Sequence, residues 1–554
     1  MNKINESIEE ITTGKKGFNR RHFITGAAAT AVGASALGLA ACGNSPDAAQ
    51  DSVADAPAEL IRLRIATQKQ EGPAAPWMTK GGSLQILSCV SEYLIWLDPL
   101  GSLEPAIATE WKATDSGKTW TITIRTDVTF HDGSPLTADD IIYTFESHLD
   151  EASASQSAAL LGDLKSGSIV KVDDTTIVFN LEKVNANFPY VLSNTSYGLC
   201  IIKSGEKGDA SWATKMNGAG PWVMVSHTEG DRTLLTPNLN YYDAARIPQY
   251  ESMEQIQYVS AATALPALKT GEIESISLLL AADAATLSES DFTLVKVPTC
   301  GGLHLHMRCD IGKFVDKRIR QAAALTIDRE AFIDGVLLGA AEIANDSVME
   351  SFKTTVDTSV PQRMPDIEAA KALMAEAGVP NGFDVVLNTW KRDDNDKFAQ
   401  YVKTAWAQIG INVTLEIDGS DGGASVFYTY VPYPAVKGES PENNGSWLAC
   451  EAGIAEWAGR AVPDPYLVRE WRSDGDWNAA HVNDADIDAA IDMWTSAITP
   501  TDKKAASSAI QKASLEATPY IVAYNETRIS ATSNKIAGLL YNAQGGVYSS
   551  GQSA

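Results

Sequence analysis

The chain has 554 residues, of which 44% are hydrophobic and 21% are charged, and its formal net charge at pH 7 is −26. This is an ordinary globular composition with enough apolar residues for a large core, and at ~100 to 200 residues per domain the length predicts two or three lobes. The negative charge repels the phosphates of nucleic acids, so we expect no nucleic-acid partner.

The first 41 residues predict an export signal. Arg20 and Arg21 lie in the stretch 19–24 (NRRHFI), and an apolar run that follows ends at Cys42. This arrangement resembles a bacterial lipoprotein signal of the twin-arginine type, in which a peptidase cuts before the cysteine and a diacylglycerol is added to its sulfur. Residue Asn19 departs from the pattern, which usually has Ser or Thr. The resemblance implies an extracytoplasmic protein that is anchored to the cell membrane by a lipid on Cys42.

A transmembrane anchor is the alternative interpretation of the same segment. Residues 23–41 contain no charged side chain, and their number is close to the ~20 that span a bilayer. However, Ala and Gly dominate this run, and small residues precede the cysteine as a signal peptidase requires. We therefore favour a cleaved signal.

Beyond the signal, the sequence predicts a tether and then an α/β fold. Residues 42–59 are rich in Ala, Asp, Ser and Pro, which is typical of a flexible tether. The alternating run 61–66 predicts the first strand. Further β-like and amphipathic helical patterns then follow one another, for example at 119–125 and 175–180 for strands and at 367–377 and 397–409 for helices.

The cysteines give no sign of a metal or redox centre. Five of them follow Cys42, at widely spaced positions, and no pair has CxxC spacing: Cys89, Cys200, Cys300, Cys309 and Cys450. One disulfide bridge remains an alternative in an oxidising compartment. We expect small buried apolar side chains at these positions.

Three successive segments have a specific character: 103–111 (LEPAIATEW), 115–125 (DSGKTWTITIR) and 130–141 (FHDGSPLTADDI). A turn opens the second segment, Gly133 lies in another turn, and Thr137 is placed to cap a helix with an acidic first turn. Together the segments resemble the signature region of the family 5 extracellular solute-binding proteins, the dipeptide-, oligopeptide- and nickel-binding receptors of ABC importers.

The resemblance continues along most of the remaining chain, in the segments 218–222, 238–242, 264–273, 314–330, 369–378 and 519–521. Most of these residues are expected to hold the scaffold. We interpret Gly133, Gly220 and Gly271 as turn or cap glycines, and Arg318 and Arg320 as surface or interlobe ion-pair residues.

The resemblance implies a periplasmic-binding-protein-like α/β fold, in which two large lobes close on a cleft and an extra domain is inserted in the first lobe. Domain I would comprise residues 60–78, 218–300 and 518–554, domain II residues 79–217, and domain III residues 301–517. The ligand would lie between domains I and III, and closure about a hinge would present a form that the membrane permease recognises.

Ligand identity is expected to depend on the segment 455–465 (AEWAGRAVPDP). In the peptide receptors of the family an Asp three positions after a Trp pairs with the peptide's α-amino group. The matching positions here are Trp457 and Arg460, and the family's Asp-Pro is Asp464 and Pro465. Arg460 would repel an ammonium group and bind a carboxylate or phosphate. The alternative is a shifted alignment, in which Glu456 or Asp464 binds the amine.

Other candidate ligand residues rest on their position near the predicted cleft. Trp390 lies in a loop after a strand, and Gly302 and His304 open domain III; because His304 and His306 alternate on a predicted strand, we expect only one of them to face the ligand. Tyr93 and Trp447 are further aromatic candidates.

The sequence therefore predicts a lipid-anchored receptor that captures a peptide or a related small solute and passes it to ABC permease subunits. It contains no GxSxG, HExxH, GxxxxGK[ST] or strand-linked GxGxxG motif, so we expect no enzyme activity, no cofactor and no metal, and we expect a monomer. Alternatives are a receptor for a metal chelate such as nickel, or for a non-peptide carboxylate.

Overall fold

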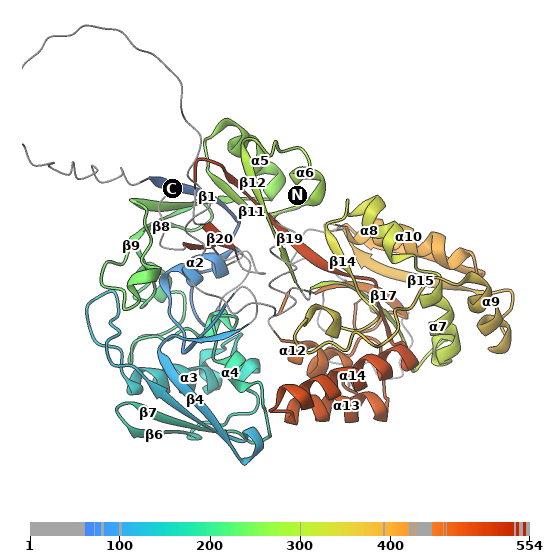
Figure 1. The fold of residues 1–554 in the computed structure, drawn as a ribbon, viewed down its shortest axis with the longest axis horizontal. Coiled ribbons are helices and arrows are strands. Elements are labelled where there is room, and N and C mark those ends of the chain that lie inside the picture. The colour runs from blue at the N-terminus through green and yellow to red at the C-terminus, as the bar shows by residue number, and fades with distance from the viewer. Residues whose placement is uncertain are drawn as a thin grey trace, which may run out of the picture. The chain divides into compact units, whose positions relative to one another are not determined.

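The structure is a computed structural model, and it describes residues 61–70, 72–78, 82–98, 102–299, 301–391, 394–419, 427, 446–457, 459–460, 462–536, 539–541 and 547–549 (Figure 1). These residues belong to one structural unit, which spans residues 59–554. The predicted signal with Arg20, Arg21 and Cys42, and the predicted tether, lie outside the described residues. Within the described ranges, no helix has both the length and the hydropathy that a membrane crossing requires.

The largest sheet of the described residues joins strands from distant parts of the chain. Its order is β12 (Phe292–Pro298), β19 (Tyr524–Ser533), β11 (Ser275–Leu279), β1 (Arg62–Gln68), β10 (Ser252–Tyr258), β9 (Arg232–Pro237) and β8 (Trp222–Thr228), with β14 (Ala341–Ile343) paired to β19. The predicted alternation of β1 is confirmed, because Leu63 and Ile65 pack with α2 (Ser83–Val90) while Ala66 packs with α5 (Ala261–Thr270). The two helices therefore cover opposite faces. The short helix α6 (Ala281–Ala284) follows β11.

A four-stranded antiparallel sheet forms a second part of the fold, here called the four-stranded module. Its order is β4 (Ala108–Thr114), β5 (Thr119–Ile124), β7 (Thr176–Asn180) and β6 (Ile169–Asp173), and it is accompanied by α3 (Ala138–Leu149), α4 (Phe188–Val191) and the pair β2 (Ile95–Leu97) and β3 (Leu103–Pro105). Phe145 of α3 packs edge-on against Phe179 of β7. Thr137 is confirmed as the cap at the start of α3, where it forms a capping box with Asp140.

A five-stranded sheet with helices on both faces forms the third part, here called the five-stranded module. Its order is β16 (Ile411–Asp418), β15 (Phe383–Trp390), β17 (Ala452–Trp457), β13 (Gly302–Met307) and β18 (Tyr520–Val522). One face packs on α7 (Lys317–Leu325), α8 (Arg329–Val336), α9 (Ile367–Glu376) and α10 (Asn395–Ala407). The other packs on α12 (Asp464–Tyr466), α13 (Ala485–Ser496) and α14 (Pro500–Ala517). A separate hairpin joins β20 (Leu539–Tyr541) and β21 (Val547–Ser549).

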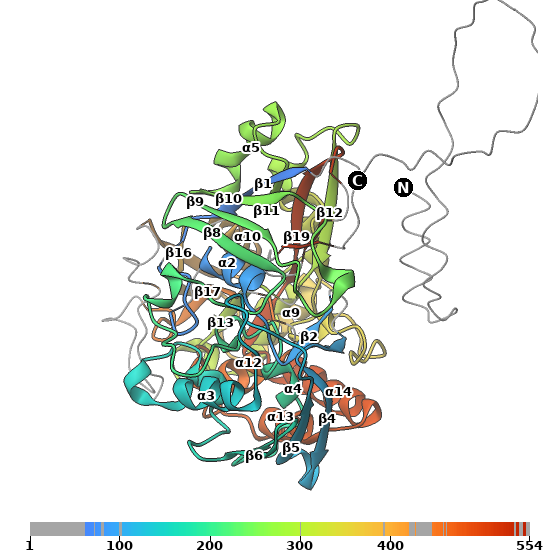
Figure 2. The same cartoon turned by 90° about the vertical axis from the view of Figure 1, so that its left-hand side faces the viewer.

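The chain passes between the large sheet and the five-stranded sheet at two neighbouring places, between β12 and β13 and between β18 and β19. Glu526 N–H donates to the carbonyl of Gly301 at 2.8 Å, and Thr299 N–H donates to the carbonyl of Glu526 at 2.9 Å. A Cβ on Gly302 would lie 2.6 Å from the carbonyl oxygen of Tyr524, so the close approach of the two passages requires glycine here. Figure 2 shows β19 beside β12 at this crossing. The division into three domains at the boundaries given above remains a prediction.

The interpretation of Gly220 as a turn or cap glycine is wrong. Gly271 does cap α5 with φ 75°, and Gly133 has φ 83°, but Gly220 does not adopt a positive φ. A Cβ on Gly220 would instead lie 2.6 Å from the carbonyl oxygen of Ser91. This glycine is required by close backbone packing.

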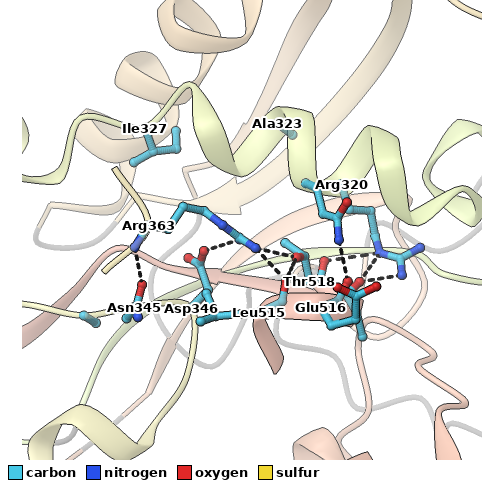
Figure 3. A network of polar contacts seen from close by, with 12 residues as sticks. Arg320, Ala323, Ile327, Asn345, Asp346, Arg363, Leu515, Glu516 and Thr518 are labelled. Atoms are coloured by element: carbon cyan, nitrogen blue, oxygen red, sulfur yellow. Dashed lines mark hydrogen bonds and ion pairs between the residues drawn. The ribbon is translucent and has the colours of Figure 1, made fainter. Parts of the chain in front are cut away.

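The interpretation of Arg320 as a surface or interlobe ion-pair residue is also wrong. Arg318 is partly exposed and pairs with Asp316, as expected. Arg320 is buried and donates to backbone carbonyls, from Nη2 to Ala517 at 2.6 Å and from Nη1 to Phe314 at 2.6 Å (Figure 3). It joins α7 to the end of α14, where the last helical carbonyls lack intrahelical partners.

A buried cluster of opposite charges lies beside Arg320 in the same module. Asp346 is 0% exposed, and its carboxylate oxygens accept from Arg329 Nη2 at 2.6 Å and from Arg363 Nη1 at 2.5 Å. Arg363 also donates to the carbonyl of Leu515 at 2.5 Å (Figure 3). The cluster therefore ties the segment after β14 to α8 and to the end of α14.

Candidate functional site

Trp457 ends β17 and lies in a cluster of aromatic rings. Its ring centroid is 5.5 Å from that of Trp447, 5.3 Å from that of Trp477 and 5.8 Å from that of Tyr466. The side chain is 8% exposed, and its indole Nε1 is buried without a hydrogen-bond partner. A buried N–H group without an acceptor carries a desolvation penalty that an incoming acceptor would remove.

Arg460 lies in the connection from β17 to α12, Asp464 is the first residue of α12, and their environments differ. Arg460 is exposed, and Asp464 is partly buried. The carboxylate of Asp464 accepts from Asn187 Nδ2 at 2.6 Å and from Trp494 Nε1 at 3.0 Å. Both of its oxygens therefore already have protein donors, and its role toward a ligand stays a prediction.

His304 lies on β13 and pairs with a carboxylate inside the five-stranded module. Its Nδ1 lies 2.8 Å from Oε1 of Glu470, and both side chains are buried. Burial raises the pKa of the Glu470 carboxyl group above its usual value, and the neighbouring histidine opposes this shift. The ring also lies 5.7 Å from that of Trp457, so the pair belongs to the aromatic cluster.

His306 lies on the same face of β13, because side chains two positions apart on a strand point the same way. Its Nε2 lies 3.3 Å from Sγ of Cys450, and burial lowers its pKa to about 3. The two histidines therefore share one face of β13 instead of alternating between faces, and which of them faces a ligand stays a prediction.

The remaining predicted residues are divided between two places. Trp390 is the last residue of β15 and is buried, so its predicted place in a loop is wrong. Trp390 and Trp447 belong to the same apolar core as Trp457. Tyr93 belongs to the core around α2, and its hydroxyl donates to the carbonyl of Tyr197 at 3.0 Å. The structure thus brings together Trp390, Trp447, Trp457 and His304, and leaves Tyr93 elsewhere.

A partly open cavity lies beside the crossing of the two sheets. Gly302 and Glu456 are predicted residues that line it, and the walls include Leu279 at the end of β11, Leu337 after α8 and Tyr524 of β19. Glu456 faces this cavity, whereas its neighbour Trp457 packs on the other face of the sheet. The cavity and the aromatic cluster are therefore separate places on the two faces of β17.

Three polar partners of the predicted residues were missed by the sequence analysis: Asn187, Glu470 and Trp494. Asn187 follows Asn185-Ala186 before an apolar helix, a pattern typical of a helix start. Glu470 lies in a short π-helix (Leu467–Trp471), and Trp494 lies in α13. No local pattern marks them. Among the described residues, no three His, Cys, Asp or Glu side chains are grouped as a metal site would require.

The three sheets and their helices define the class of protein as an α/β, periplasmic-binding-protein-like receptor. The model of the bacterial extracellular solute-binding proteins, family 5, matches residues 102–502. The chain belongs to this family. Its members are extracellular solute-binding proteins, which places this chain with the binding proteins of ABC importers.

Individual relatives are distant. The chain is 26% identical over 422 residues to Heme-binding protein A of Haemophilus influenzae, an overlap that covers 70% of this chain and 73% of the relative. It is 24% identical over 496 residues to the probable deoxycholate-binding periplasmic protein YgiS of Escherichia coli, covering 84% and 88%. The structure of the periplasmic binding protein DppA from Helicobacter pylori, in complex with the peptide STSA, aligns with a TM-score of 0.69 at 20% identity, covering 88% and 98%.

Proposed function

We propose that this protein is a receptor, anchored to the cell membrane by a lipid on Cys42, that captures a small solute with an acidic group and delivers it to ABC permease subunits. The proposal concerns a peptide or a related carboxylate, bound where β17 ends. The observation that carries the acidic specificity is the unsatisfied, buried Nε1 of Trp457 three positions before the exposed Arg460.

The chemistry of these two side chains favours an anion. An indole N–H is a donor only, and a guanidinium group presents several donors that match a carboxylate in pairs. The surrounding rings of Trp447 and Tyr466 exclude water from one side of the indole and strengthen an electrostatic contact there. An α-amino group in the same position would meet like charge.

The ligands for which the relatives are named support this proposal. Heme, deoxycholate and a peptide are chemically different, but each can carry a carboxylate. We infer that the acidic group is the shared feature and that the apolar walls select the rest of the solute.

The test is a thermal-shift panel with alanyl dipeptide, N-acetylated alanyl dipeptide, deoxycholate and nickel–histidine. A ligand well above its dissociation constant raises the melting temperature. We expect the acetylated peptide or deoxycholate to stabilise the protein, and Arg460→Gln to abolish that shift. Arg62→Gln, which removes an exposed guanidinium paired with Glu251, is the matched control and should keep it. Stabilisation by the free-amine peptide alone would refute the acidic specificity.

A further inference from the structure

Two hydrogen bonds join the four-stranded module to the five-stranded module. Asn187, immediately before α4, donates from Nδ2 to Oδ1 of Asp464 at 2.6 Å, although the two residues are 277 positions apart in the sequence. The backbone N–H of the preceding residue, Ala186, donates to the carbonyl of Thr495 in α13 at 3.0 Å. One side-chain bond to a carboxylate and one backbone bond therefore lie next to each other across this contact.

The segment that carries Asn187 is held in place by its own module. Trp120 Nε1 donates to the carbonyl of Asn185 at 3.2 Å, and the N–H of Asn185 donates to the carbonyl of Gly117 at 3.2 Å. The side chain of Asn185 in turn accepts from the N–H of Asn187 at 2.9 Å. The side-chain amide of Asn187 is thus already positioned for its contact with Asp464, so the contact does not require a loop to become ordered.

The acceptor is held in place by the other module. Trp494 Nε1 donates to Oδ2 of Asp464 at 3.0 Å, which orients the carboxylate so that Oδ1 points at Asn187. Lys503 donates to the carbonyl of Trp494 at 2.8 Å and lies 4.2 Å from the centre of its ring. Burial lowers the pKa of Lys503 to about 8. Donor and acceptor are therefore both positioned before they meet.

The contact lies away from the two passages at which the chain crosses between the large sheet and the five-stranded sheet. Figure 1 shows α4 beside α13, at a distance from the crossing marked by β19, and Figure 2 agrees. A rotation about the crossing strands separates α4 from α13 while the bonds inside each sheet stay intact. Both hydrogen bonds would therefore form in the closed arrangement and break on opening.

We propose that Asn187 and Asp464 form an interlobe latch that sets how much of the protein is closed, and that Asn187 is a positioning residue for solute capture. The proposal rests on the proposed function for its biological meaning, but the two hydrogen bonds can be tested without a solute. A hydrogen bond to a charged group that forms in only one of two states shifts their ratio by roughly tenfold. Apparent solute affinity changes by the same factor when the closed form is the minor one.

The test uses the ligand-free protein and the variant Asn187→Asp, which has nearly the same shape but opposes two carboxylates. Hydrogen exchange is followed by mass spectrometry in the peptide that contains the amide of Ala186, and the radius of gyration by small-angle X-ray scattering. We expect at least tenfold faster exchange of that amide and a larger radius. Asn180→Asp places the same charge at the exposed end of β7 in the same module, and should change neither quantity.

Interchanging the two side chains should restore the contact. In the double variant Asn187→Asp with Asp464→Asn, donor and acceptor are interchanged, so slow exchange and the smaller radius should return. The latch proposal would be overturned if Asn187→Asp showed the exchange rate and radius of gyration of the wild type. It would also be overturned if the double variant exchanged as fast as the single variant and had the same larger radius. If Asn187→Asp fails to fold, Asn187→Ala is measured in the same way. A failed solute panel would leave these results unaffected, so the two proposals fail separately.

Discussion

Replacing Asp346 by asparagine is expected to destabilise the five-stranded module strongly. The side chain keeps its shape, and asparagine tolerates the positive φ of 55° at this position, so the loss of charge is the main change. Arg329 and Arg363 would then be two guanidinium groups, 3% and 11% exposed, without their shared anion. Removal of one partner from a buried ion cluster costs about 3–5 kcal/mol. That is a large part of the 5–15 kcal/mol by which folded proteins are typically stable.

The assay is chemical denaturation at pH 7, followed by tryptophan fluorescence, with Glu251→Gln as the control. Glu251 forms an exposed ion pair with Arg62, and exposed pairs of this kind contribute little to stability. We expect the transition midpoint to fall clearly in Asp346→Asn and to stay near that of the wild type in the control. Equal midpoints in the two variants would refute the argument that the buried cluster stabilises this module.

Three further outcomes are expected. Burial holds the pKa of folded His306 at about 3, so only the unfolded chain gains a proton at this residue as the pH falls below ~6.5. The free energy of unfolding should therefore drop by about 2 kcal/mol between pH 7 and pH 5 because of this residue. Denaturation curves of His306→Gln should lack that part of the drop. Arg320→Met leaves the carbonyls of Phe314 and Ala517 without this donor and should cost about 2 kcal/mol or more, whereas Arg318→Met at the surface should change the melting temperature little. Cys42→Ser should move the full-length protein from the membrane fraction to the soluble extracytoplasmic fraction, and retention on membranes would contradict the predicted lipid anchor.

The sequence by itself determined the features that depend on near neighbours in the chain. The alternation of β1 follows from side chains that face opposite sides at successive positions, and the capping box of α3 needs only Thr137 and Asp140, three residues apart. The order of the family's motifs was likewise readable, because it is a property of the chain and not of its packing. These features predicted the α/β class and the family that the comparisons confirm.

Only the tertiary structure decided which distant groups meet. Arg320 and Arg318 look alike in sequence, but one is buried against the end of α14 and the other is partly exposed. Gly220 is required because the carbonyl of Ser91 leaves no room for a Cβ. The carboxylate of Asp464 is held by donors on two other segments, Asn187 and Trp494. Local propensity carries no information on such pairs, because their meeting depends on how sheets and helices pack rather than on spacing along the chain.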